Sequence, residues 1–244
     1  MDELYDARQY FRTISQVLRG QVKMMKARGY KNINDKDLGL TDKQILSLDE
    51  VDSMTALQRC NVSKIKKFTR NKLNTIYRKD KKEIHIYYVD DYINDNSVIK
   101  KTNKDIQTDI LLYVEENDVQ HIIIISTVSY DEGLRMLNTD SRTIYEYFED
   151  RQLIITPDDN ILFNNPELLS RKQTQDVIDA YKINLDNLPK VIVEDPVVRY
   201  FGWGDHNIGQ VIKYTNIAPF DSTIVKSWIY FRVIVPVKSV NGLL

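Results

Sequence analysis

Apolar residues recur every three to four positions near the start of the chain, which predicts an amphipathic helix over residues 6–26. Gly29 is placed to end this helix. The sequence TDKQ at residues 41–44 has the pattern of a capping box and predicts the start of a second helix. A third, strongly basic helix is expected next, and its apolar face would consist of Ile65, Phe68, Leu73 and Ile76.

The pattern then changes to that of strands. Residues 83–89 are rich in β-branched and aromatic side chains, and residues 121–126 form a continuous apolar run typical of a strand covered on both faces. Between them, residues 102–116 carry an apolar residue at every fourth position, which predicts a helix. This order favours a right-handed βαβ unit with parallel strands. Two short helices are expected at residues 131–137 and 143–148.

The sequence TPDDN at residues 156–160 is the clearest turn signal in the middle of the chain. We therefore expect two domains, residues 1–156 and residues 157–244, and an α+β fold. The second domain is expected to contain a helix and two strands, at residues 172–181, 209–214 and 226–235.

The composition is that of a folded protein, with 42% hydrophobic and 28% charged residues among 244, and a net charge of −1. The single cysteine, Cys60, excludes an intramolecular disulfide, and the three histidines are too far apart in sequence for a zinc motif. We expect no metal and no cofactor. The first residues lack the apolar core of a secretory signal, and the longest apolar run, residues 122–125, is too short to span a bilayer. An intracellular soluble protein is expected.

The segment LPKVIVEDPVVRYFG, residues 188–202, is the most informative part of the chain. It lacks groups suited to acid–base or nucleophilic catalysis. Asp195 is a favoured helix cap, Pro196 suits a first helical turn, and Gly202 can end a short helix. Arginine beside two aromatic residues is typical of protein interfaces. The alternative is that Tyr200 and Phe201 belong to the core.

This segment resembles the signature of the fifth-largest subunit shared by the eukaryotic nuclear RNA polymerases and of the archaeal counterpart of that subunit. The similarity continues through GQV at residues 209–211 and through the final strand, residues 228–235. Upstream, the sequence RGY at residues 28–30 and the order of the predicted strands also fit the family. The resemblance covers most of the chain.

The resemblance implies a non-catalytic subunit of a DNA-dependent RNA polymerase. Its amino-terminal domain would be a jaw beside downstream duplex DNA, similar to a restriction-endonuclease core without the active site. Its carboxy-terminal domain would dock on the largest subunit. The residues expected at this interface are Leu188, Pro189, Asp195, Pro196, Val197, Arg199, Tyr200, Phe201, Gly202, Gly209, Gln210 and Val211.

The chain departs from the family pattern in three places. The stretch after the domain boundary lacks the family's two histidines, and an acid, Asp131, stands where the family has a lysine after the second jaw strand. Extra residues occur within 41–80, 203–208 and 217–225. These departures indicate a divergent member, with a nuclear location for a cellular protein and a virion or cytoplasmic viral factory for a viral one.

A basic stretch precedes the first predicted strand. Residues 64–82 hold nine basic residues and one acid, so the local charge is 9 − 1 = +8. Contact with DNA phosphates without sequence specificity is one interpretation. A solvated helix face, or a clamp on an acidic protein surface, is the other. The basic residues are Lys64, Lys66, Lys67, Arg70, Lys72, Arg78, Lys79, Lys81 and Lys82.

Two other functions would suit parts of the sequence. A free-standing nucleic-acid-binding transcription regulator could have the same fold. An Mg²⁺-dependent nuclease would need carboxylates and a lysine at one strand end, for which Lys82, Glu83, Asp90 and Asp91 are the candidates. The acid-x-lysine pair that such a site needs is missing from the second strand and from the next one. Because similarity of fold does not carry activity, the nuclease hypothesis is the weaker one.

Overall fold

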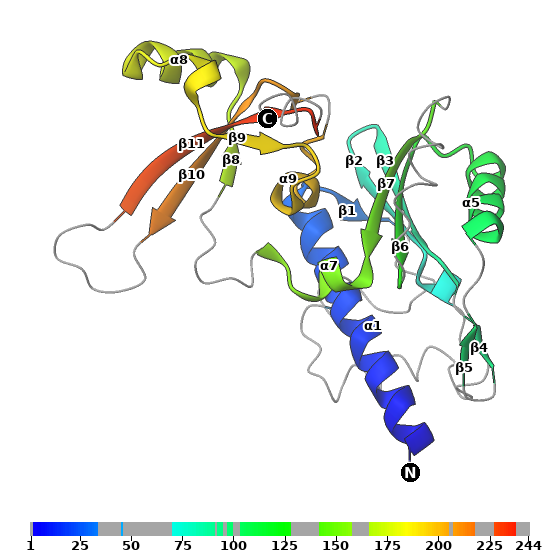
Figure 1. Ribbon diagram of the computed structural model, residues 1–244. Coiled ribbons are helices and arrows are strands. Elements are labelled where there is room, and N and C mark those ends of the chain that lie inside the picture. The colour runs from blue at the N-terminus through cyan, green and yellow to red at the C-terminus, as the bar shows by residue number, and fades with distance from the viewer. Residues whose placement is uncertain are drawn as a thin grey trace. The chain divides into compact units, whose positions relative to one another are not determined.

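The computed structural model describes residues 2–33, 45, 70–90, 92–94, 97–99, 103–127, 142–157, 166–204, 207–217 and 227–237. The chain divides into two compact units, Met1–Ile155 and Thr156–Leu244 (Figure 1). Each unit has its own mixed sheet with helices, so the fold is α+β, as predicted. Within the described residues, no helix combines the length and the apolar character needed to cross a membrane.

The amino-terminal unit is built on a five-stranded sheet in the order β1-β2-β3-β6-β7. The first three strands are antiparallel, whereas β3, β6 and β7 run parallel. With α5 (Asn103–Glu116), β3 and β6 form the predicted βαβ unit, and the hairpin of β4 (Tyr92–Asn94) and β5 (Ser97–Ile99) precedes α5. The sheet strands are β1 (Lys31–Asn32), β2 (Thr75–Lys79), β3 (Lys82–Tyr88), β6 (His121–Ser126) and β7 (Ile144–Glu149).

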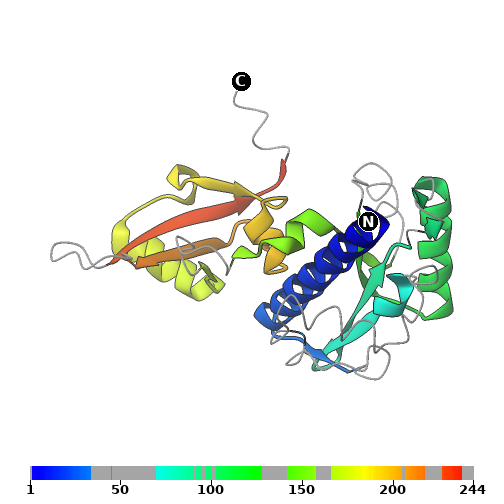
Figure 2. The same cartoon turned by 90° about the horizontal axis from the view of Figure 1, so that it is seen from below.

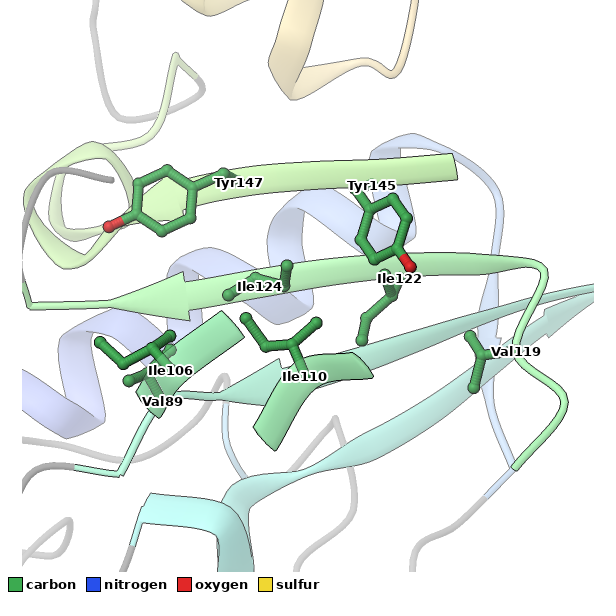
Figure 3. Close-up of a cluster of buried hydrophobic side chains, with 8 residues drawn as sticks. All are labelled: Val89, Ile106, Ile110, Val119, Ile122, Ile124, Tyr145 and Tyr147. Carbon is green, nitrogen blue, oxygen red and sulfur yellow. The ribbon is translucent and has the colours of Figure 1, made fainter. Parts of the chain in front are cut away.

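Helices α1 (Asp2–Ala27) and α5 cover opposite faces of this sheet (Figures 1 and 2). Ile122 and Ile124 of β6 face α5 and pack with Ile106 and Ile110 of that helix (Figure 3). Because side chains alternate along a strand, the other isoleucines of β6 face α1, and all four of its isoleucines are fully buried. The predicted strand covered on both faces is confirmed.

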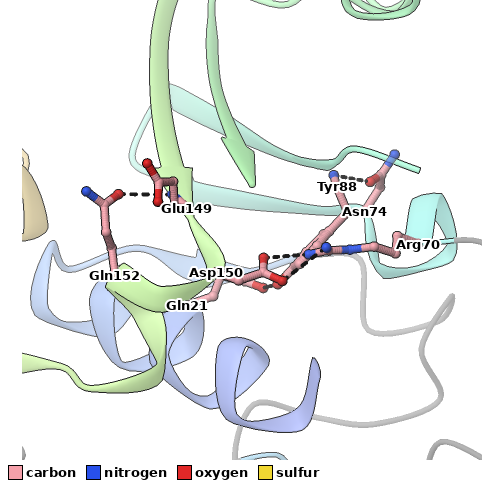
Figure 4. Close-up of polar contacts among 7 residues, drawn as sticks. All are labelled: Gln21, Arg70, Asn74, Tyr88, Glu149, Asp150 and Gln152. Atoms are coloured by element: carbon pink, nitrogen blue, oxygen red, sulfur yellow. Dashed lines mark hydrogen bonds and ion pairs between the residues drawn. The ribbon is translucent and has the colours of Figure 1, made fainter. Parts of the chain in front are cut away.

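The close crossing of α1 and α7 (Asp150–Ile154) depends on Gly20. An ideal Cβ at this position would lie 1.8 Å from the carbonyl oxygen of Leu153. Only a residue without a side chain allows the two backbones to approach this closely. α7 itself begins with a capping box in which the Gln152 side chain accepts a hydrogen bond from the Glu149 N–H (Figure 4).

The carboxy-terminal unit has a four-stranded sheet in the order β8-β10-β11-β9. β11 pairs antiparallel with β10 and parallel with β9, and β8 pairs antiparallel with β10. Its core consists of Val191, Val198, Ile212, Tyr214 and Ile234. The elements are β8 (Pro166–Leu168), α8 (Arg171–Tyr181), η4 (Leu185–Asn187), β9 (Lys190–Ile192), α9 (Pro196–Tyr200), β10 (Val211–Ile217) and β11 (Ser227–Val235).

Two predicted helices are wrong. The predicted helix at residues 143–148 is strand β7, in which buried Tyr145 and Tyr147 alternate with residues on the opposite face. The third helix was expected to include Leu73 and Ile76, but Leu73 ends the short helix η2 (Arg70–Leu73) and Ile76 lies in β2. Pairing with neighbouring strands made both β7 and the segment that contains Ile76 strands. The remaining parts of the third helix, the capping box at 41–44 and the helix at 131–137 lie outside the described residues.

Candidate subunit interface

Helix α9 has the start that the sequence predicts. The Asp195 side chain accepts a hydrogen bond from the Val197 N–H at 2.9 Å, and Pro196 occupies the first turn, where its missing N–H costs nothing. The helix is only five residues long, so these local interactions hold its first turn in place.

Gly202 ends the same helix with a Schellman motif. Its N–H donates to the Arg199 carbonyl, and the Trp203 N–H donates to the Val198 carbonyl, both at 2.9 Å. Gly202 has a φ of +69°, a left-handed conformation that glycine adopts without strain. Trp203 then packs against the core that contains Val198.

The side chains of α9 divide between the interior and the surface. Val198 is fully buried and Tyr200 is 2% exposed, so Tyr200 lies in the packed interior, in line with the alternative considered from the sequence. Pro196 is exposed, whereas Val197, Arg199 and Phe201 are half-buried. The Phe201 ring stacks on Trp203 with centroids 4.7 Å apart. Trp203 was missed from the sequence, although it directly follows the signature.

The other predicted interface residues gather around the end of β11. The Pro189 carbonyl accepts from the Val233 N–H at 3.0 Å, and the Gly209 N–H donates to the Ile234 carbonyl at 2.9 Å. The Ile234 N–H in turn donates to the Gln210 carbonyl. Leu188 is half-buried ahead of β9, and Val211 is fully buried at the start of β10. Residues separated by twenty positions in the sequence are therefore fixed to one strand.

The basic residues between positions 64 and 82 do not all lie on the protein surface. Arg70 is 0% exposed, and its guanidinium binds both carboxylate oxygens of Asp150, at 2.7 and 3.1 Å (Figure 4). It also lies 5.4 Å from the centre of the Tyr88 ring, and burial raises the pKa of Tyr88. Arg70 is thus a structural residue and has no surface to offer to DNA. Lys64, Lys66 and Lys67 lie outside the described residues.

The remaining basic residues concentrate on the hairpin formed by β2 and β3. Lys81 and Lys82 are exposed at its tip, and Lys79 pairs with Lys82 across the strands. The Lys79 ammonium donates to the Arg28 carbonyl at 2.9 Å, while Arg78 forms an ion pair with Glu83. Lys72 is exposed in η2, away from the hairpin tip in sequence.

Strand β1 adds a basic residue that the sequence did not single out, because Lys31 lies opposite Arg78. We call Lys31, Arg78, Lys79, Lys81 and Lys82 the basic hairpin. With Asp80 and Glu83 included, its charge is 5 − 2 = +3.

Glu83 and Asp90, two carboxylates proposed for a nuclease site, do not lie close together. Glu83 lies at the start of β3 and Asp90 lies beyond its end, roughly 20 Å apart along an extended chain. Glu83 is paired with Arg78, and Asp90 accepts a hydrogen bond from the Asn71 N–H at 2.8 Å. Asp91 lies outside the described residues, which contain no group of three or more His, Cys, Asp or Glu side chains able to hold a metal ion.

A second charged cluster, which sequence reasoning missed, joins α1 to β6 and β7. Arg28 makes two hydrogen bonds to Glu146, at 2.7 and 2.8 Å, and His121 Nε2 lies 2.7 Å from the same carboxylate. Burial acts to raise the pKa of Glu146. The positive charge of Arg28 and the hydrogen bonds from His121 and Arg28 outweigh burial and lower that pKa to about 2. The cluster stabilises the amino-terminal unit.

The segment that contains the signature matches a known family: residues 157–234 fit the description RNA polymerase Rpb5, C-terminal domain. A domain of this description implies a non-catalytic subunit of an RNA polymerase. All twelve predicted interface residues lie inside the matched segment. The match concerns this segment of the chain, whose sequence is similar to the C-terminal domain of the Rpb5 family. No curated protein matches the chain.

Proposed function

We propose that this chain docks on the largest subunit of a DNA-dependent RNA polymerase through its carboxy-terminal unit, and that its amino-terminal unit forms part of the lower jaw beside downstream DNA. The observation that carries the proposal is the family match across residues 157–234, which includes the whole signature. The compartment would follow the polymerase: the nucleus for a cellular enzyme, a virion or cytoplasmic viral factory for a viral one.

The geometry of α9 supports a docking role. The N-cap, the Schellman motif and the stacked Phe201 and Trp203 rings hold this short helix in one conformation. An element that is already ordered loses little conformational entropy when it binds. Its partly exposed residues, Val197 and Arg199 among them, supply apolar and charged contacts.

The test is to purify the tagged full chain from its native cells or infected host, separate complexes by size exclusion, and identify partners by mass spectrometry. Val197→Asp places a charge at the second position of α9, where an acid suits the positive end of a helix. Lys172→Asp places the same residue at the second position of α8, with a larger change of charge, and is the control.

Wild type and Lys172→Asp are expected to elute with a very large complex containing the largest polymerase subunit. Val197→Asp should reduce the bound fraction at least about tenfold, as expected for a central interface residue. Elution of the wild type alone at 28.7 kDa would refute the subunit role and favour the free-standing regulator. Wild-type binding by Val197→Asp would refute the docking surface only.

For DNA, we propose that the basic hairpin contacts phosphates of the downstream duplex. What supports this is the concentration of lysines at the exposed tip, where Lys81 and Lys82 have no core role. The double variant Lys81→Gln, Lys82→Gln should lower the slope of log affinity against log salt by about 2, with equal effects on unrelated DNA sequences. Lys172→Gln serves as the control, and an unchanged slope in the double variant would contradict the contact.

A further inference from the structure

Helix α5 has an outer face that the described part of its own unit leaves uncovered. Its inner residues Ile106 and Ile110 are buried against the sheet (Figure 3). On the outer side, Leu111 is 45% exposed and Leu112 is 51% exposed. α5 lies at the margin of the amino-terminal unit in both views, and no other described helix or strand of that unit covers this side (Figures 1 and 2). The two leucines are therefore available to a partner.

Thr108 extends the apolar surface between the leucines. Residues three and four positions apart are neighbours on a helix, so Thr108 lies beside both Leu111 and Leu112. Its hydroxyl donates to the Lys104 carbonyl at 3.0 Å. Since this hydrogen bond satisfies the hydroxyl within the helix, the threonine can offer its methyl group to a partner. We call Thr108, Leu111 and Leu112 the α5 strip.

The charges beyond the carboxyl end of the α5 strip are acidic and unfavourably placed for the helix alone, whereas the exposed Lys104 lies one turn before Thr108. Glu115 and Glu116 occupy the last turn, which contains no basic residue. Asp118 follows with a φ of +48°. The carboxyl end of a helix is its negative end, so carboxylates there are destabilising. A cationic partner would relieve this repulsion.

We infer that the outer face of α5 is a docking surface for a basic amphipathic segment of a partner protein, in which apolar side chains cover the α5 strip and flanking Lys or Arg residues meet Glu115 and Glu116. Charge complementarity selects this occupant, since the same carboxylates repel nucleic acid. The inference rests on the amino-terminal unit alone and does not depend on the polymerase role.

A synthetic helical peptide of leucine and lysine is a suitable probe, with a leucine–glutamate peptide as its charge-reversed counterpart. Binding of each labelled peptide to the full chain is measured by fluorescence anisotropy. The first variant is Leu111→Gln, Leu112→Gln, because glutamine has nearly the helix propensity of leucine. The second is Glu115→Gln, Glu116→Gln. The matched control is Ile144→Gln, which removes an isoleucine that is 58% exposed on β7. Circular dichroism establishes that each variant is folded.

The leucine–lysine peptide is expected to bind wild type and Ile144→Gln equally, and the leucine variant at least about tenfold more weakly. The glutamate variant should also bind more weakly and lose most of its salt dependence. The leucine–glutamate peptide should not bind. Unchanged affinity in the leucine variant, or equal loss in Ile144→Gln, would overturn the inference. So would a wild-type dimer in analytical ultracentrifugation that the leucine variant loses, because the occupant would then be a second copy.

Discussion

Glu146→Gln tests whether the cluster of Arg28, His121 and Glu146 stabilises the amino-terminal unit. The variant keeps the size of the side chain and removes its charge. The side chain of Arg28 is 3% exposed and that of Glu146 is 22% exposed, so water screens the lost ion pair only weakly. Folding lowers the pKa of Glu146 from 4.5 to about 2, and a tenfold change in proton affinity corresponds to about 1.4 kcal/mol. At pH 7 the free energy of unfolding of Glu146→Gln is therefore expected to be about 3 kcal/mol lower than that of wild type.

The same pKa values give the direction in which the stabilisation by Glu146 changes with pH. Because the pKa of Glu146 is lower in the folded state, the unfolded chain binds more protons between pH 4.5 and about 2. The stabilisation is present above pH 4.5 and is lost as the pH falls through this window. By linkage, about 2 kcal/mol of it should be gone at pH 3. At pH 3 the difference in free energy of unfolding between wild type and Glu146→Gln should thus be about 1 kcal/mol.

Urea unfolding at pH 7 and pH 3 provides the measurement, and hydrogen exchange of peptides from β6 and β7 reports on the amino-terminal unit alone. Glu83→Gln is the matched control, since Glu83 pairs with Arg78 at the surface, with side chains 39% and 51% exposed. That variant should change stability by less than about 1 kcal/mol at both pH values. A difference for Glu146→Gln that stays constant between pH 7 and pH 3 would refute the reasoning.

Two further substitutions test the packing of the same unit. Arg70→Met leaves the carboxylate of Asp150 buried without its partner and should lower the free energy of unfolding by about 3–5 kcal/mol. The double variant with Asp150→Asn should lose less stability than the sum of the two single variants. Additive losses in urea unfolding would contradict the pairing. Gly20→Ala should destabilise by about 1–3 kcal/mol despite the better helix propensity of alanine, because the new Cβ meets the Leu153 carbonyl. An unchanged or higher thermal midpoint for Gly20→Ala would count against that contact.

The sequence alone determined the elements whose signals are local. The periodicity of α1 and α5, the apolar run of β6, and the cap and glycine of α9 each act within a few residues. For the same reason the signature could be read directly, since Asp195, Pro196 and Gly202 set the start and end of their helix without distant partners. The segment that matches the family contains this local pattern.

Only the tertiary structure decided the roles that depend on distant partners. Arg70 belongs to a basic run in the sequence, yet Asp150, eighty residues away, holds it in the interior. β7 has a sequence that also suits a short helix, and pairing with β6 made it a strand. The sequence left Tyr200 as either an interface or a core residue, and the structure shows it buried. In these three cases burial or strand pairing is set by residues that meet only after the chain has folded, so the local pattern around each of them did not specify it.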